Sequence, residues 1–242
     1  MLHRLQGFIR RVRDAYTSYE FHTVFHTINN FCAVDLSSFY LDILKDRLYT
    51  SGPASSDRRA AQTVLEQTIS ALIRLMAPIL SFTAEELWTY LPEASRPTSS
   101  VHLSSFPDPD PAALDDELAA RWDRLIQVRA EVARPLEKAR AEKIIGSSLE
   151  AHVTLYAGPG LFSFLHDHEG QLATLFIVSG VGLARHEGRP PSANSTSQDL
   201  AVVVSRAEGS KCARCWTYRT DVGADARHPA LCARCAAVLQ HA

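Results

Sequence analysis

Hydrophobic and polar residues alternate in the first half of the chain with the three- and four-residue spacing of amphipathic helices. One stripe begins at residue 2, and a second follows it directly. They comprise Leu2, Leu5, Phe8, Ile9, Val12, Tyr16 and Tyr19, and then Phe21, Val24, Phe25, Ile28, Phe31 and Cys32. No Ser, Thr, Asp or Asn precedes the first stripe, so we expect this helix to begin upstream in a longer protein.

Three more helices are predicted up to about residue 91. Asp35 is the expected N-cap of the third helix, and Pro78 should end or kink the fourth because proline lacks a backbone N–H. Thr83 and Glu86 form a capping box that predicts the start of the last one. The stripes are Phe39, Tyr40, Ile43, Leu44 and Leu48; Ala61, Val64, Leu65, Thr68, Ile69, Leu72, Ile73 and Met76; and Leu87, Trp88 and Leu91. Together they predict an antiparallel bundle over residues 1–106.

The pattern changes after residue 106. A long helix is predicted from about Asp115 to Glu142, with Pro135 bending it. Beyond it the chain looks like a small α+β domain, so residues 107–205 form a second predicted domain. Its cues are a strand-like alternation at Ala151, Val153 and Leu155, and short apolar runs at 174–178 and 200–204. Residues 101–106 are expected to be extended, and residues 188–197 to form an exposed, mobile loop.

Composition describes a globular protein. The chain has 242 residues, of which 46% are hydrophobic, and no apolar run is long enough to span a membrane. We therefore expect no membrane partner and a cytoplasmic location. The net charge of −2 argues against a uniformly basic surface, but local patches exist. Arg4, Arg10, Arg11 and Arg13 crowd the first helix.

Four of the five cysteines form two Cys-x-x-Cys pairs near the end of the chain. Cys212 and Cys215 are separated from Cys232 and Cys235 by the sixteen residues 216–231. Two such pairs with this spacer are typical of a zinc site, and four protein ligands leave no position for a catalytic water. The predicted module, residues 206–242, has few large apolar residues, so one structural zinc ion would supply much of its folding energy.

Charged and aromatic residues accompany the two pairs. Lys211, Arg214 and Arg234 could offset the negative charge of a zinc–tetrathiolate centre and also face phosphates. Trp216 could stack on an unpaired RNA base or simply cover the zinc loops, and the sequence leaves both open.

No self-contained catalytic centre is evident. His22 and His26 have the spacing of a shared metal site but lack the glutamate of a metalloprotease, so we expect a structural or surface role. The same holds for His166 and His168. Phosphate-binding and dinucleotide-binding glycine loops are absent, as is a nucleophile elbow.

Several longer segments resemble bacterial isoleucyl-tRNA synthetases. They are FYLDILKDRLYT (39–50), MAPILSFTAEELW (76–88), IGSSLEA (145–151), KCARCW (211–216) and CARC (232–235). The first two are shared in looser form with the valyl and leucyl enzymes. The resemblance covers nearly the whole chain and implies the carboxy-terminal third of such an enzyme: a helical anticodon-binding domain of the class I type, a junction domain and a zinc module.

The resemblance also implies a function. The region would recognise isoleucine tRNA as a monomer, while an amino-terminal domain with bound ATP would attach the isoleucine. That domain's HIGH and KMSKS signatures occur nowhere in these residues, and neither does its editing domain, so we expect this chain alone to be inactive. The residues expected to contact tRNA are Trp216, Arg214, Lys211, Arg219, Arg10 and Arg11.

Two alternatives remain open. A free-standing zinc-ribbon adaptor could bind DNA or a protein, although no helix-turn-helix and no long basic run are evident, and we expect no DNA partner. A tRNA-binding homologue could also act in trans without belonging to a synthetase.

Overall fold

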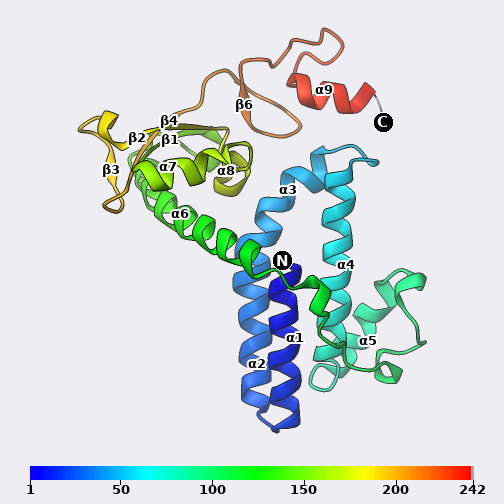
Figure 1. The fold of residues 1–242 in the computed structure, drawn as a ribbon. Helices are drawn as coiled ribbons and strands as arrows, with labels where there is room; N and C mark the ends of the chain where they lie inside the picture. The colour runs from blue at the N-terminus through cyan, green and yellow to red at the C-terminus, as the bar shows by residue number, and fades with distance from the viewer. Residues whose placement is uncertain (241–242) are drawn as a thin grey trace. The chain divides into compact units, whose positions relative to one another are not determined.

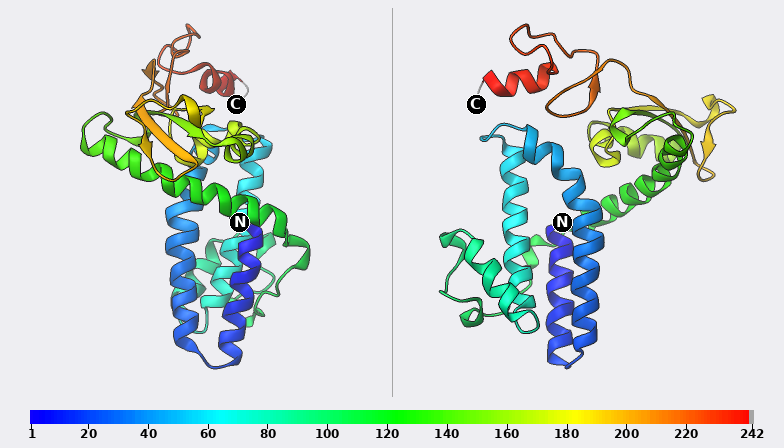
Figure 2. Two further views of the ribbon diagram at one scale, coloured as in Figure 1. Left: turned by 60° about the vertical axis from the view of Figure 1, so that its left-hand side comes forward. Right: turned by 180° about the vertical axis from the view of Figure 1, so that it is seen from behind.

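The computed structural model describes residues 1–240, and the chain divides into two compact units. The first comprises residues 1–48 and 53–120, and the second comprises residues 49–52 and those from 121 onwards. The ribbon of the whole chain is drawn in Figures 1 and 2. The mainly helical fold with a small sheet agrees with the predicted class. The predicted division at residues 106 and 205 stays a prediction, and its last two residues lie outside the described part.

The first unit is a helical bundle. Its helices are α1 (Leu2–Thr17), α2 (Phe21–Asn30), a π-helical segment (Phe31–Tyr40), α3 (Leu41–Thr50), α4 (Ser56–Met76) and α5 (Ser81–Tyr90). Helices α1 and α2 lie side by side and run in opposite directions (Figure 1). Helix α4 ends at Met76, just before Pro78, as predicted. Among the described residues, no helix is both long enough and apolar enough to cross a bilayer.

The core of this unit lies where α1 packs on α2 and α4. Phe8 and Phe31 stack with their ring centroids 4.2 Å apart, and Val12 and Val24 are fully buried beside them. Burying side chains of this size stabilises the fold by about 1.5 to 3 kcal/mol each. A smaller cluster surrounds Trp88, whose indole N–H donates to the carbonyl of Thr98 at 3.1 Å.

Three sequence predictions for this bundle are wrong. Asp35 caps no helix, because α2, the π-helical segment and α3 follow one another without a break; its carboxylate pairs instead with Arg4 at 2.5 Å. Thr83 and Glu86 lie inside α5, which starts earlier, at Ser81. Residues 101–106 begin with a 3₁₀ turn rather than an extended segment.

The second unit holds the sheet. Its elements are α6 (Asp116–Ala141), β1 (Ala151–Ala157), α7 (Pro159–His166), α8 (Glu169–Phe176), β2 (Gly180–Arg185), β3 (Asn194–Ser195) and β4 (Leu200–Arg206). The strand order is β2-β1-β4-β3, with β1 parallel to β2 and antiparallel to β4. The central strand alternates buried and half-buried residues, as the sequence predicts. Pro135 lies inside α6.

Of the two apolar runs that the sequence singles out, residues 200–204 lie in strand β4, whereas residues 174–178 form no strand. Residues 174–176 end α8 and Ile177 caps it in the left-handed conformation, so this run is not a strand. The strand that pairs with β1 is Gly180–Arg185 instead, where two glycines dilute the apolar pattern. The loop expected at residues 188–197 contains the short strand β3.

The end of the chain forms a small module within the second unit. It consists of β5 (Ser210–Lys211), β6 (Tyr218–Arg219) and α9 (Ala233–Gln240). The first two pair as an antiparallel hairpin. A cluster of four buried cysteines, with Val222 and Leu231 against it, takes the place of a hydrophobic core. A module this small needs such a cross-link.

Candidate metal centre and nucleic-acid interface

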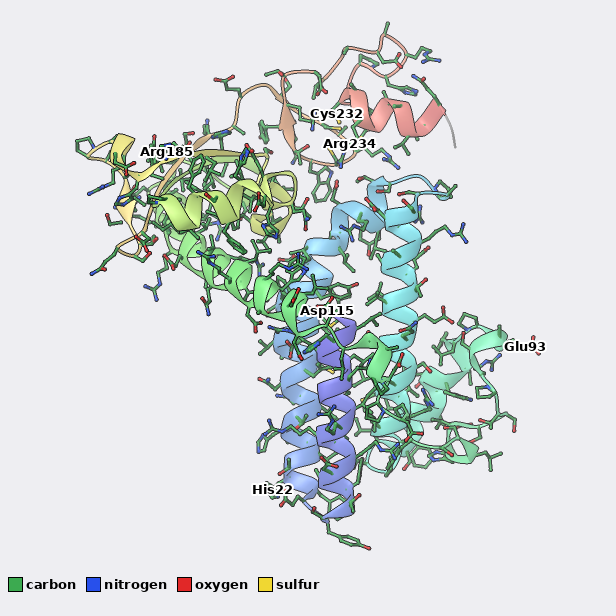
Figure 3. The ribbon with its side chains drawn as sticks, viewed as in Figure 1. His22, Glu93, Asp115, Arg185, Cys232 and Arg234 are labelled. Carbon is green, nitrogen blue, oxygen red and sulfur yellow. The ribbon has the colours of Figure 1, made fainter. Side chains whose placement is uncertain are left out.

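The four cysteines come from two separate turns. Cys212 and Cys215 lie in the turn between β5 and β6, whereas Cys232 directly precedes α9 and Cys235 lies in its first turn. Their four sulfur atoms lie within 4.8 Å of one another, and the Sγ atoms of Cys215 and Cys232 are 3.8 Å apart. Figure 3 labels Cys232 in this module. The fold thus brings together the residues that the sequence pattern singles out.

The surroundings of the sulfur atoms shift the pKa values of the thiols in opposite directions. Burial alone would raise the pKa of Cys212, but hydrogen bonds from the backbone amides of Cys215, Cys232 and Arg214 lower it to about 6. Burial, together with the neighbouring sulfur atoms of Cys232 and Cys215, raises the pKa of Cys235 to about 12. Four sulfurs so close together can all ionise only around a cation.

This donor set fits zinc. Zn²⁺ prefers four thiolates in tetrahedral geometry, whereas hard cations such as Mg²⁺ and Ca²⁺ prefer oxygen ligands. Three of the cysteines are fully buried, and Cys215 is 8% exposed. The site is therefore closed, as in structural zinc centres. The expected cofactor, one structural zinc ion, agrees with this chemistry.

Trp216 follows the first pair directly. Its backbone N–H donates to the carbonyl of Cys212 at 2.9 Å, and its φ of +65° turns the chain sharply. The indole is 59% exposed, and the ammonium nitrogen of Lys211 lies 5.3 Å from its ring centroid. An aromatic surface beside a cation is therefore open to solvent at the zinc loops.

The two arginines predicted nearby have partners within the protein. Arg214 donates to the backbone carbonyl of Thr50, in the short segment 49–52 of the same unit. Arg219 bonds to Asp221 at 3.1 Å, and this bond raises the pKa of the guanidinium. Neither side chain is as available to a ligand as Lys211 and Trp216.

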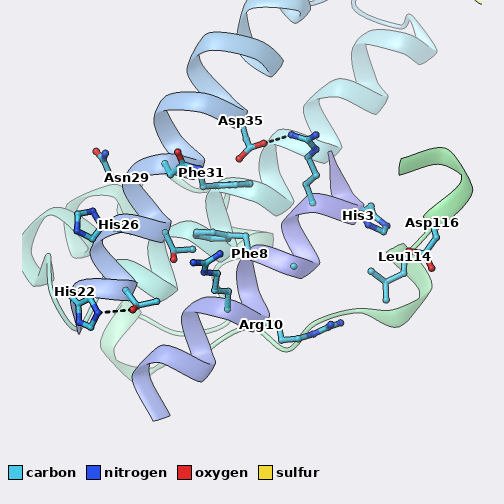
Figure 4. A pocket seen from close by; sticks show the side chains of 16 residues that line it. His3, Phe8, Arg10, His22, His26, Asn29, Phe31, Asp35, Leu114 and Asp116 are labelled. Carbon is cyan, nitrogen blue, oxygen red and sulfur yellow. Dashed lines mark hydrogen bonds and ion pairs between the residues drawn. The ribbon is translucent and has the colours of Figure 1, made fainter. Parts of the chain in front are cut away.

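Arg10 and Arg11 line a polar groove in the first unit, of about 1070 Å³. Helix α1 forms one wall, and α2 contributes His22 and His26 to the other (Figure 4). Phe8 lines it together with Phe31. Within the part of the chain that the structure describes, neither arginine makes a hydrogen bond or ion pair, so both guanidinium groups are free for an anion.

Sequence reasoning set the two histidines aside as a failed metal site, yet both line this groove. Their four-residue spacing already places them on one face of a helix. That spacing does not predict that the neighbouring helix, which carries the arginines, faces the two histidines across a groove. Acidic groups also lie at the groove: Asp35, which is paired with Arg4, and Asp116.

Comparison with known families decides the relationship. Residues 1–155, more than half of the chain, match the family described as the anticodon-binding domain of tRNA ligase. The chain belongs to this family. Residues 209–238, with all four clustered cysteines, match a second family, described as the zinc finger found in FPG and IleRS. The second match coincides with the module that lacks a hydrophobic core.

Three proteins with similar sequences are named isoleucine–tRNA ligase. This chain is 54% identical to the protein from Symbiobacterium thermophilum, and the alignment covers 98% of this chain. It is 51% identical to that of Moorella thermoacetica and 48% identical to that of Geobacter sulfurreducens, each over 99%. The resemblance to the isoleucyl enzymes is confirmed. The chain spans about a quarter of each relative (26%), somewhat less than the predicted third.

Proposed function

We propose that this chain is the tRNA-binding, carboxy-terminal region of an isoleucine–tRNA ligase and that it recognises the anticodon region of isoleucine tRNA. The observation that carries the proposal is the match to the anticodon-binding family over residues 1–155, on a bundle whose groove holds two unpaired arginines. The similarity to three isoleucine–tRNA ligases supports the choice of tRNA.

Affinity would come mainly from phosphate contacts. Arg10 and Arg11 can each present several N–H donors to phosphate oxygens because no group among residues 1–240 accepts from them. Each phosphate contact releases counterions from the RNA, so binding should weaken steeply as salt rises. Such contacts position the RNA without reading its sequence.

Discrimination among tRNAs would come from base contacts. The exposed indole of Trp216 can stack on an unpaired base, and the neighbouring Lys211 can meet a phosphate. Arg214 and Arg219 lie next to this surface and would support RNA binding there. Arg214 would do so chiefly by holding the first zinc loop through its hydrogen bond to Thr50. Cys212, Cys215, Cys232 and Cys235 would be the zinc ligands that keep this surface in shape.

Catalysis would belong to another part of the ligase. The longer relatives are named isoleucine–tRNA ligase, and residues 1–242 contain neither catalytic signature of the family. We propose that the chain by itself is a monomer that binds tRNA in the cytoplasm, does not bind ATP, and attaches no isoleucine.

The test is binding of the purified chain to isoleucine tRNA and to a variant with a swapped anticodon, at several salt concentrations. We expect tighter binding to isoleucine tRNA. Replacing Arg10 and Arg11 with Gln should lower the salt slope by about 0.7 to 0.9 per lost contact for both RNAs. Trp216→Ala should selectively weaken the binding of isoleucine tRNA, by about 1 to 3 kcal/mol.

A matched control is Lys45→Gln, which removes one positive charge from a lysine already paired with Asp42 at 2.7 Å. Its salt slope should equal that of the unmodified chain. Equal affinity for both RNAs, or an equal loss for both on replacing Trp216, would contradict anticodon recognition. Isoleucyl-tRNA formation by the chain alone would contradict the assignment of catalysis to another part.

A further inference from the structure

Two arginines of the second unit are held over phenylalanine rings. The guanidinium carbon of Arg124, on α6, lies 4.3 Å from the ring centroid of Phe164. That of Arg185, at the end of β2, lies 5.3 Å from the ring centroid of Phe162. Both phenylalanines belong to α7, and Figure 3 labels Arg185 beside that helix. Each pair is a cation–π contact.

The two pairs lie on opposite sides of α7, because residues two positions apart on a helix point about 200° apart. A histidine one turn further along continues each pair. His166 stacks on Phe162, at 6.1 Å and an interplanar angle of 12°, and His168 packs against Phe164 at 4.7 Å. One Arg–Phe–His stack therefore runs along α7, and a second extends from α7 to His168, directly before α8.

Neither guanidinium has an anionic partner. Arg124 and Arg185 are exposed, and among the described residues neither makes an ion pair or a side-chain hydrogen bond. By contrast, the exposed Arg227 of this unit pairs with Asp225 at 3.0 Å, and the half-buried Arg140 pairs with Glu137 at 2.6 Å. The charge on each side of α7 is thus uncompensated.

Stacking prepares these side chains for a ligand. A ring beneath a guanidinium fixes its plane while leaving the N–H donors at its edge free. Less side-chain entropy is then lost when an anion binds. A planar fork of donors matches phosphate oxygens two at a time, as a bidentate contact.

We propose that Arg124 and Arg185 form a third RNA-contacting region, across α7, that holds phosphates of the tRNA backbone. The inference rests on the proposed function and adds a contact region outside the α1–α2 groove and the zinc loops. Arg185 and His166 both lie against the Phe162 ring, so this ring already has partners within the protein, and we assign it no stacking contact with a base. This surface therefore binds RNA without regard to its sequence.

The experiment compares Arg124→Met and Arg185→Met with the unmodified full chain. Methionine keeps an apolar cover over each ring but removes the charge. Binding to isoleucine tRNA and to the anticodon-swapped tRNA is measured across a salt series. Each variant should lower the salt slope by about 0.7 to 0.9 and reduce the affinity for both RNAs by the same factor.

Two further sets of variants sharpen the result. Arg124→Lys and Arg185→Lys keep the charge and should keep most of the salt slope. Arg227→Met removes the same charge from an arginine already paired with Asp225, and should leave the slope unchanged. Circular dichroism and zinc content, measured on every variant, establish that each remains folded.

The outcomes separate the two proposals. An unchanged slope with a lowered melting temperature means that the arginines only cover the rings; the inference then fails and the proposed function stands. Unequal losses for the two RNAs mean base recognition at α7 and also overturn the inference. If the unmodified chain binds neither RNA, the proposed function fails, and the inference fails with it.

Discussion

At the scale of single residues, the zinc module depends on backbone conformations that few amino acids adopt. Gly209 has a φ of +88°, and a Cβ atom placed there would lie 2.2 Å from the carbonyl oxygen of Arg219. That oxygen belongs to β6, the partner of β5, so the strands could not keep their present separation. The glycine is required by the hairpin that carries the first cysteine pair.

Gly209→Ala should therefore weaken the module, since φ strain alone costs about 1 to 3 kcal/mol and the backbone clash adds to it. Competition with a chelator should release zinc at a lower chelator concentration than in the unmodified chain. Gly160→Ala is the control, because a Cβ atom at Gly160 meets nothing within 4 Å. Equal zinc retention in both variants would argue against this account of the hairpin.

The five cysteines allow a second residue-level prediction. Cys232 is fully buried among the other three sulfur atoms, whereas Cys32 is half-buried in the helical bundle, away from any other cysteine. Cys232→Ser should abolish stoichiometric zinc, because the buried site loses a thiolate ligand. Cys32→Ser should keep one zinc per chain. Elemental analysis of the purified variants measures both, and zinc retained by Cys232→Ser would remove that residue from the ligand set.

At the scale of elements, α1 is joined to α4 by a polar contact within an apolar interface. The hydroxyl of Tyr16 donates to the carbonyl of Leu75 at 2.9 Å, and its ring stacks on Phe106 at 5.0 Å. Burial raises the pKa of Tyr16 to about 12, from an ordinary value of 10. The phenolate form is therefore disfavoured in the folded bundle.

This pKa shift predicts how the stability of the bundle depends on pH. Below pH 10 the tyrosine is protonated in both states, and its contribution is complete. As pH rises from 10 towards 12 the unfolded chain loses the proton first, so the free energy of unfolding falls. Tyr16→Phe should remove this fall while costing about 0.5 to 1.5 kcal/mol at neutral pH, the net value of a hydrogen bond.

Urea unfolding of the bundle at pH 8, 10 and 11 provides the measurement. Tyr90→Phe is the control, because Tyr90 is 77% exposed. This substitution should leave the pH dependence of the free energy of unfolding unchanged. The same fall in stability for Tyr16→Phe as for the unmodified chain would assign it to another group.

One of the family-like segments, IGSSLEA (145–151), forms the turn between α6 and β1. In IGSSLEA, the carboxylate of Glu150 accepts a hydrogen bond from the amide of Gly146 at 2.9 Å. This bond lowers the pKa of Glu150. Arg140 donates to Ser148 at 3.0 Å, and Ile145 is buried. The segment fixes how the long helix passes into the central strand, so its role in this chain is structural.

At the scale of the whole molecule, the zinc module derives its stability from a different source than the rest of the chain. The first unit has apolar clusters built from its own helices, and the sheet of the second unit buries apolar side chains such as Val153 and Leu155, whereas the end of the second unit is centred on four sulfur atoms. Removal of the metal should therefore affect the module more than the rest of the chain. A module with so few large apolar residues cannot stay folded without its cross-link.

Treatment with a strong chelator should make the amides of residues 209–238 exchange with solvent hydrogen rapidly, while those of α1, α2 and α4 stay protected. Hydrogen exchange followed by mass spectrometry measures both regions in one sample. Adding back zinc should restore protection, and adding Mg²⁺, which prefers oxygen ligands, should not. Full protection of residues 209–238 after chelation would contradict a structural role for zinc.

The sequence by itself determined the features that depend on local spacing. Helical periodicity predicted α1, α4 and α6, and the end of α4 followed from Pro78. The cysteine spacing predicted one metal cluster because the chemistry of four thiolates needs little else from the fold. The family-like segments predicted the relationship to isoleucine–tRNA ligases, which the comparisons confirm.

Only the tertiary structure decided which side chains are free to act. Arg10 and Arg214 look alike in the sequence, yet one lines a groove without a partner and the other is bound to a backbone carbonyl. Phe25 continues an apolar stripe but is 59% exposed, whereas its neighbour Val24 is fully buried in the core of the bundle. Availability depends on contacts between residues far apart in the chain, and local spacing carries no record of them.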